Sequence, residues 1–163
     1  MRPATRYLID GNNLIGQEPS LSLDDDASRR LLVGAICAFA RHARKPATIV
    51  FDGPAPGEGR DRAELGSVRI LYAGSGRTAM SADDRILQMV EKAGRPADLT
   101  VVTSDRRLGN RARSRGAAIL AGHKFRQLLY QCAAEEATGP EKPTHIDLAD
   151  WAAYFNLEDP HTK

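Results

Sequence analysis

Three short apolar runs that each close at an aspartate constrain the fold more than any other feature of the sequence. The runs with their closing residues are Arg6–Asp10, Ala47–Asp52 and Leu99–Asp105. An unbroken apolar run closed by a turn is typical of a buried strand in a parallel sheet. Because the carboxyl ends of parallel strands lie at one edge of the sheet, the sequence predicts that these aspartates gather there.

Each of these aspartates also has an ordinary structural explanation. Asp-Gly is a common turn, and residues Gly11–Asn13 tolerate the positive φ angles of a sharp exit turn after Asp10. Asp105 is a suitable N-cap for a helix that follows it. The recurrence of the pattern favours a functional cluster, because clustered carboxylates repel one another and are usually held together by a bound cation.

Alternating apolar runs and amphipathic segments predict an α/β fold, a three-layer sandwich around a mostly parallel five-stranded sheet. The expected strands are Arg6–Asp10, Ala47–Phe51, Ser67–Tyr72, Leu99–Val102 and Ala117–Leu120. The alternation in Ser67–Tyr72 is typical of an edge strand. Helices are expected over 24–45, 81–94, 106–115 and 125–133, with loops over 14–23, 53–59 and 73–80.

The chain length of 163 residues predicts one domain, because domains typically run to ~100–200 residues. We place this domain at residues 1–137, followed over 138–163 by a linker and a short helix around Trp151 that docks on the domain. The start lacks the apolar core of a signal peptide, and the longest apolar run is too short to span a bilayer, so we expect a cytoplasmic protein without membrane contact. Cys37 and Cys132 lie in apolar helical patterns and are expected in the core.

The segment Ser81–Asp84 opens a helical pattern with two adjacent acids. Ser81 as N-cap and Asp84 three residues later predict a capping box, which gives Asp84 a structural role. Asp83 has no such role. Adjacent helical residues point about 100° apart, so both acids rarely face one ion. We therefore predict Asp83 as the cation ligand and Asp84 as a supporting residue.

Basic residues are concentrated between Asp105 and Arg126, where Asp105 is the only acid. They are Arg106, Arg107, Arg111, Arg113, Arg115, Lys124 and Arg126. A basic surface beside an acidic site is what a nucleic-acid processing enzyme requires, since phosphate contacts supply most of the affinity. A helix surface that is merely solvated and paired with acids explains the charges equally well.

The four acidic motifs resemble, in order and spacing, the YacP-like NYN domains of the PIN-like nuclease superfamily. They are Asp10-Gly11-Asn12-Asn13, Val50-Phe51-Asp52-Gly53, Ser81-Ala82-Asp83-Asp84 and Thr103-Ser104-Asp105, and the similarity runs from Tyr7 to about Gln131. The resemblance implies the strand order 3-2-1-4-5, numbered along the five expected strands, and a metal-dependent endoribonuclease site at the carboxyl edge. Relatives often have an aromatic residue where Asn12 stands, and Thr-Ala-Asp-Glu where Ser81–Asp84 stands.

Carried over by position, the resemblance implies that Asp10, Asp83 and Asp105 bind Mg²⁺ or Mn²⁺. Asn13 falls on the asparagine of the family's first motif and completes the candidate catalytic set, while Asp52 falls on its strand-two aspartate. Hard cations prefer such oxygen ligands, and they activate water and neutralise phosphate charge during phosphodiester hydrolysis. Ser104 could orient a carboxylate or phosphate.

The expected partner is RNA, with messenger RNA or ribosome-associated RNA as candidate substrates. Candidate phosphate contacts are Arg77, Arg106, Arg107, Arg111, Lys124 and Arg126. Two other functions stay open. One is an inactive RNA-binding or adaptor module of the same fold. The other is a receiver-like phosphoacceptor domain, for which Thr103 and Lys124 are suitably placed but the paired acids after the first strand are missing.

Overall fold

A computed structural model describes residues 6–17, 21–22, 26–55, 62–74 and 79–138 of the chain. Of the region expected to form the linker and the docked C-terminal helix, only Thr138 lies within these ranges, and it is helical instead of part of a linker. The candidate contact Arg77 lies outside them. The predicted domain boundary after residue 137 therefore stays a prediction. No helix within the described ranges is both long enough and apolar enough to cross a membrane.

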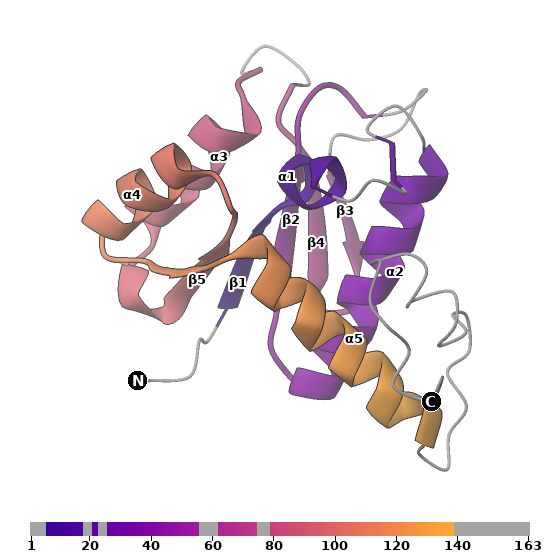
Figure 1. The fold of residues 1–163 in the computed structure, drawn as a ribbon. Coiled ribbons are helices and arrows are strands. Elements are labelled where there is room, and N and C mark those ends of the chain that lie inside the picture. The colour runs from indigo at the N-terminus through magenta and orange to yellow at the C-terminus, as the bar shows by residue number, and fades with distance from the viewer. Residues whose placement is uncertain (1–5, 18–20, 23–25, 56–61, 75–78, 139–163) are drawn as a thin grey trace.

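The fold is built on one mixed sheet of six strands (Figure 1). The strands are β1 (Arg6–Asp10), β2 (Ala47–Phe51), β3 (Arg62–Leu65), β4 (Val68–Tyr72), β5 (Leu99–Val102) and β6 (Ala118–Leu120). They lie in the order β3-β4-β2-β1-β5-β6, and every neighbouring pair is parallel except β3 with β4. The predicted α/β class with a mostly parallel sheet is confirmed.

The predicted count of five strands is wrong, and the strand order differs from the expected one by the additional strand β3. This strand pairs antiparallel with β4, so β4 is an inner strand and not the predicted edge. All four residues of β3 are exposed. A strand that buries no side chain has no apolar run or alternation by which its sequence could reveal it.

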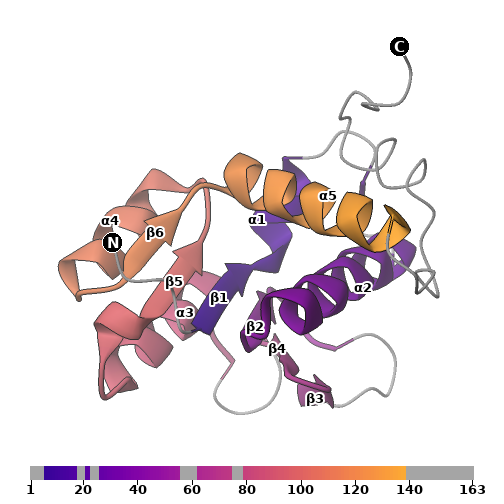
Figure 2. The same ribbon diagram turned by 90° about the horizontal axis from the view of Figure 1, so that it is seen from below.

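Helices cover both faces of the sheet (Figure 2). They are α1 (Gly11–Gly16), α2 (Asp26–Ala43), α3 (Ala82–Lys92), α4 (Arg106–Ser114) and α5 (Gly122–Thr138), with a 3₁₀ turn at Pro96–Asp98. One core cluster contains buried residues of α1, α2 and α5, including Leu14, Ile36 and Phe125. The other contains buried residues of α3 and α4, including Ile86 and Leu108. The three predicted layers are therefore present. Cys132 is buried as expected, whereas Cys37 is only half-buried.

Helix α1 replaces the sharp exit turn and part of the loop expected after Asp10. It begins at Gly11, directly at the end of β1, and Asp10 is its N-cap. Gly11 does not have the positive φ angle that the turn would require. Glycine is needed at this position because it has no side chain: a Cβ atom there would lie 2.5 Å from Cε1 of Phe51. The glycine allows α1 to pack directly against β2.

The sheet register aligns the ends of the acidic strands. Asp10 pairs with Val50 of β2, and Ile9 pairs with Val102 of β5. Asp52 and Asp105 therefore follow the carboxyl ends of the strands on either side of Asp10. The predicted convergence of these aspartates at one edge of the sheet is a consequence of this register.

Candidate active site

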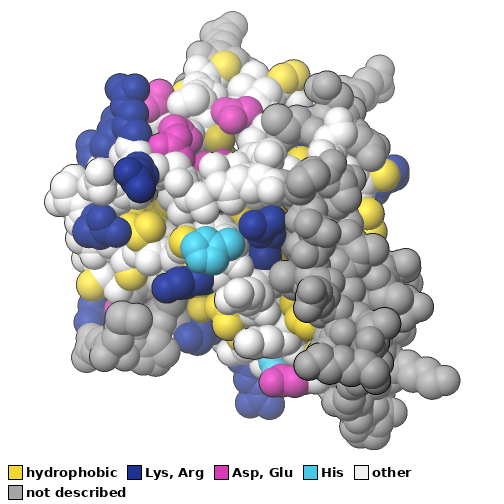
Figure 3. Space-filling model, in the orientation of Figure 1, with side chains coloured by type: hydrophobic (Ala, Val, Ile, Leu, Met, Phe, Trp, Pro, Cys, Tyr) yellow, Lys and Arg dark blue, Asp and Glu magenta, His cyan; other side chains and the backbone are white. Residues whose placement is uncertain are grey.

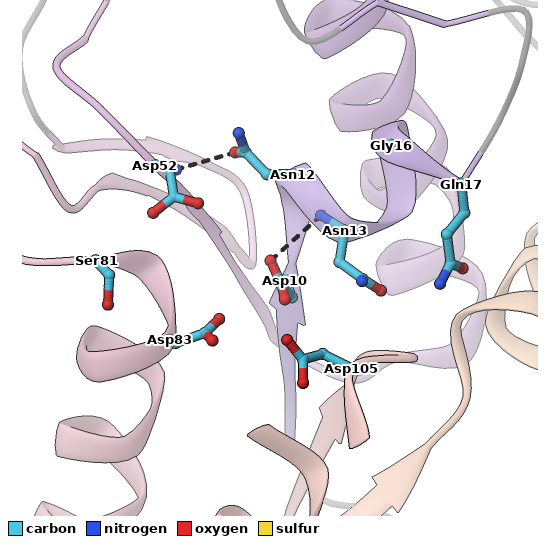
Figure 4. Close-up of a pocket in the computed structure, with 9 residues that line it drawn as sticks. All are labelled: Asp10, Asn12, Asn13, Gly16, Gln17, Asp52, Ser81, Asp83 and Asp105. Atoms are coloured by element: carbon cyan, nitrogen blue, oxygen red, sulfur yellow. Dashed lines mark hydrogen bonds between the residues drawn. The ribbon is translucent and has the colours of Figure 1, made fainter. Parts of the chain in front are cut away.

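A cavity of about 500 Å³ lies at the carboxyl edge of the sheet and has an acidic lining (Figure 4). Its four acids are Asp10, Asp52, Asp83 and Asp105. The rest of the lining is Asn12, Asn13, Gly16, Gln17 and Ser81. Asn12, Gly16, Gln17 and Ser81 were not predicted as site residues. The first three belong to helix α1 and its C-cap, a segment expected to be a turn and a loop, and Ser81 was predicted only as a helix cap.

Asp10 is the most buried acid of the cavity, with 4% of its surface exposed. Its Oδ1 accepts a hydrogen bond from the Asn13 main-chain N–H, and its Oδ2 accepts one from the Thr103 hydroxyl, both at 3.3 Å. The pKa of Asp10 is raised to about 7, chiefly by burial and also by the negative charges of Asp83 and Asp52, against the lowering effect of the two hydrogen bonds. The ionised carboxylate is thus incompletely compensated by the protein.

Asp83 comes from the first turn of α3 and points into the cavity towards Asp10 (Figure 4). Burial raises the pKa of Asp83, and the negative charges of Asp105 and Asp52 add to the effect. The neighbouring Asp84 does not line the cavity; its carboxylate lies 3.9 Å from Nη1 of Arg111. The structure thus separates the two acids as the sequence suggested, although the role of each stays a prediction.

The predicted N-cap of α3 is confirmed for Ser81, whose Oγ accepts the Asp84 main-chain N–H at 3.1 Å. This is one half of the predicted capping box. For the Asp84 carboxylate, the structure gives Arg111 as a partner. The helix start therefore depends on the Ser81 hydroxyl.

Asp105 is both a cavity residue and the N-cap of α4. Its Oδ1 accepts the main-chain N–H groups of Arg107 at 2.8 Å and Leu108 at 3.2 Å. Its own N–H donates to the Thr103 hydroxyl oxygen at 3.1 Å, and that hydroxyl donates to Asp10. Thr103 thus links the carboxylate of Asp10 to the main chain of Asp105, while the carboxylate of Asp105 faces the cavity (Figure 4).

Asp52 and Asn13 are tied to other elements of the site. Oδ1 of Asp52 accepts the N–H of Ala82 in α3 at 2.7 Å. Oδ1 of Asn13 accepts the N–H of Ser104 at 2.9 Å, and Ser104 Oγ accepts the N–H of Gly122, the first residue of α5, at 2.9 Å. These bonds fix the spacing of the elements that carry the acids.

The chemistry of the donor set fits a hard divalent cation. Asp10, Asp83 and Asp105 offer carboxylate oxygens from three different elements, and no cation of the protein neutralises Asp10 among the described residues that perturb its pKa. Among the described residues, no three His, Cys, Asp or Glu side chains lie close enough together to hold a metal ion directly. Mg²⁺ usually retains several waters and uses one or two protein carboxylates directly, so the separation is compatible with water-mediated ligation.

The candidate phosphate contacts within the described ranges lie in α4 and in the first turns of α5. Figure 3 shows Lys and Arg side chains near acidic ones on the face that it draws. Arg106, Arg107 and Lys124 are exposed, whereas Arg111 and Arg126 are half-buried. The stretch also contains cations that have local partners, since Arg115 pairs with Glu91 at 2.6 Å. Local pairing therefore explains part of the basic stretch, and the role of its exposed cations as phosphate contacts stays a prediction.

The fold and much of the chain match known proteins. The model of the YacP-like NYN domain family matches residues 7–150. A crystal structure of a tryptophan-to-leucine mutant of Rae1 (YacP) from Bacillus subtilis is similar, with a TM-score of 0.63 and 20% identity over 80% of this chain and 77% of that chain. A second structure of Rae1 (YacP) from Bacillus subtilis has a TM-score of 0.63 and 18% identity, over 79% and 75% of the two chains.

At such low identities, the structural likeness shows the fold alone. A comparison with curated proteins finds no match. The family model spans most of the chain and includes every acid of the cavity. The chain belongs to the YacP-like NYN domain family, a family of PIN-like ribonucleases.

Proposed function

We propose that the protein is an endoribonuclease that hydrolyses RNA phosphodiester bonds with Mg²⁺ or Mn²⁺. One observation carries the proposal: Asp10, Asp83 and Asp105 line a single cavity although they come from β1, α3 and the turn before α4. The raised pKa values of Asp10 and Asp83 indicate negative charge that the protein leaves uncompensated. A divalent cation is the partner that this charge favours.

A bound cation would supply Lewis acidity, which lowers the pKa of a water molecule and neutralises charge that develops on the phosphate. Asp10, Asp83 and Asp105 would hold it, directly or through water. Asn13 positions the turn that carries Asp105, through its bond to the Ser104 N–H. The Thr103 hydroxyl donates to the carboxylate of Asp10 and accepts the main-chain N–H of Asp105, and so holds the two residues next to each other.

The basic side chains beside the cavity would hold the RNA backbone. Arg106, Arg107 and Lys124 are exposed near the start of α4 and α5, so they can reach phosphates on either side of a scissile bond. Arg111 and Arg126 are half-buried, and Arg111 lies near Asp84, so we assign them weaker contacts. Phosphate contacts supply affinity without reading the sequence, so the RNA candidates stay messenger and ribosome-associated RNA.

An RNA-binding module without catalysis is the second candidate. It is favoured by the hydrogen bonds of Asp10, Asp52 and Asp105, each of which accepts a main-chain N–H at or near the start of a helix. A protein without activity would retain these acids for stability. Asp83 separates the two functions, because its carboxylate points into the cavity and Ser81 provides the cap of its helix.

The test is cleavage of cellular RNA by the purified protein with Mn²⁺, with Mg²⁺ or with a chelator. We expect metal-dependent cleavage by the wild type and its loss in Asp83→Asn at unchanged thermal stability. Asp98→Asn is a matched control, since Asp98 lies before β5, at the opposite edge of the sheet. RNA binding without cleavage by the wild type, with either metal, would support the inactive module instead.

A further inference from the structure

The carboxylate of Asp52 makes a short hydrogen bond to the helix that carries Asp83. Oδ1 of Asp52 accepts the main-chain N–H of Ala82 at 2.7 Å. Ala82 is the first residue of α3 and is fully buried, with 0% of its surface exposed. The next residue is Asp83, whose side chain points into the cavity. This bond therefore joins the carboxyl end of β2 to the turn that presents Asp83.

The bond satisfies a group that the helix itself cannot satisfy. The first N–H groups of an α-helix have no partner inside the helix. In α3 the Ser81 hydroxyl accepts the N–H of Asp84, and Asp52 accepts the N–H of Ala82. A negative charge at this position is also favourable to the helix dipole. Asp52 thus acts on α3 as a second cap supplied by a different strand.

Asp52 is in turn held by its surroundings. Its main-chain N–H donates to Oδ1 of Asn12 at 2.9 Å. The next residue, Gly53, accepts the N–H of Gly74 at 3.0 Å, and a Cβ atom on Gly74 would lie 2.6 Å from Gly53 Cα. The turn after β2 is therefore packed against the turn after β4 and attached to α1, which restrains the main chain of Asp52.

We propose that Asp52 is a positioning residue, which sets the place of Asp83 through its bond to Ala82, and that Asn12 orients Asp52 for this role. The inference rests on the proposed function, because it takes Asp83 as a cation ligand. The role requires a hydrogen-bond acceptor at Asp52 but no negative charge. A ligand of a hard cation, by contrast, requires the carboxylate.

The substitutions Asp52→Asn and Asp52→Ala separate these roles, because asparagine retains the acceptor and alanine does not. Asp52→Asn removes one negative charge from the cavity lining, so we expect it to bind Mn²⁺ in calorimetric titration, and to cleave RNA, a few-fold less well than the wild type. Asp52→Ala should lose about tenfold or more in both, as for other residues that orient metal ligands. Asp83→Asn should lose both, since the ligand itself is changed.

A measurement on the metal-free protein tests the bond directly. Amide hydrogen exchange at Ala82 should accelerate in Asp52→Ala and stay slow in Asp52→Asn. Asn12→Ala should accelerate it less, because Asp52 loses one of several restraints. Asn110→Ala is the matched control: Asn110 is exposed on α4 and its side chain accepts a hydrogen bond from Arg113. Thermal melting of each variant shows whether it is folded. If Asp52→Ala does not fold, exchange at Ala82 in Asn12→Ala still tests the proposal.

Equal losses of Mn²⁺ affinity in Asp52→Asn and Asp52→Ala would overturn the proposal, since charge would then be the property that matters. Wild-type affinity and wild-type exchange at Ala82 in Asp52→Ala would overturn it as well. Mn²⁺ binding and RNA cleavage by the wild-type protein test the proposed function separately. If it binds Mn²⁺ but does not cleave RNA, the nuclease proposal fails, whereas the role of Asp52 is still decided by the titrations and the exchange rates.

Discussion

The main-chain N–H of Ser104 donates a 2.9 Å hydrogen bond to the side-chain oxygen of Asn13, across 91 residues of sequence. The bond attaches α1 to the turn between β5 and α4, and Asp105 is the next residue of that turn. Asn13 also donates its own N–H to Asp10. Asn13 thus bonds directly to one predicted metal ligand, Asp10, and to the residue that precedes another, Asp105.

We predict that Asn13→Ala lowers RNA cleavage by about tenfold to a hundredfold, in the range found for residues that orient metal ligands. The free energy of unfolding should fall by about 1 kcal/mol, because one partly buried hydrogen bond is lost. Asn13→Asp retains the acceptor but adds a negative charge to the acidic cavity, so it should recover less than the full stability. Cleavage kinetics and urea unfolding measure the two effects, and unchanged kinetics in Asn13→Ala would show that the bond does not matter for the site.

A second prediction concerns the pH dependence of stability in the metal-free protein. The pKa of Asp10 is raised from 3.8 to about 7, so the folded state binds this proton more tightly than the unfolded state. The stability that this group contributes is full below about pH 4 and is lost as the pH rises to about 7. The loss amounts to at most about 4 kcal/mol.

Asp10→Asn cannot ionise and should unfold with a flatter pH dependence than the wild type, measured with urea in the presence of chelator. Above pH 7 the variant should be the more stable protein. Mg²⁺ should stabilise the wild type at high pH, since a ligand that binds the folded state alone shifts the equilibrium towards it. A wild type and variant with parallel pH profiles would mean that Asp10 is not perturbed.

The two ends of the Ser81–Asp84 segment should differ in their effect on stability. Ser81→Ala removes the N-cap acceptor for Asp84 N–H and should cost about 1 kcal/mol of unfolding free energy. Asp84→Ala breaks an exposed pair with Arg111 at 3.9 Å and should cost less than about 0.5 kcal/mol. Chemical denaturation measures both. A larger loss of unfolding free energy in Asp84→Ala would show that Asp84 also caps the helix, as in the full capping box that the sequence predicts.

The salt dependence of RNA binding tests the basic surface. Arg107→Glu should weaken binding to all single-stranded RNA sequences alike and flatten the slope of log affinity against log salt by ~0.7 for each lost phosphate contact. Arg95→Glu is a matched control, because Arg95 lies before β5 at the opposite edge and forms an exposed pair with Asp98. Equal affinities and equal salt slopes for the two variants in binding titrations would show that RNA does not bind along α4.

The strands that carry the site were predictable because they are buried. β1, β2 and β5 have nearly continuous apolar sequences, and their pairing followed from the preference of such runs for parallel sheets. The exposed strand β3 had no such signal. The Gly-Asn-Asn sequence after Asp10 indicates a turn locally, and the helix α1 forms there because it packs against β2, a contact distant in the sequence.

The candidate ligands were predictable as a set, but their supports were not. Motif spacing pointed to Asp10, Asp83 and Asp105, which line one cavity. The bonds of Asp52 to Ala82 and of Asn13 to Ser104 join residues 30 and 91 positions apart. No local pattern specifies such pairs, since they depend on which turns the sheet places side by side. Asn12 was overlooked for the same reason.

The use of aspartates as helix caps has a consequence for the history of such a chain. Asparagine is also a good cap, so a change from Asp to Asn at Asp10 or Asp105 would remove the charge and retain the acceptor for the helix. A single nucleotide change converts one codon into the other. If the proposed function holds, a lineage can therefore lose and regain cleavage in one mutational step, without passing through an unfolded protein.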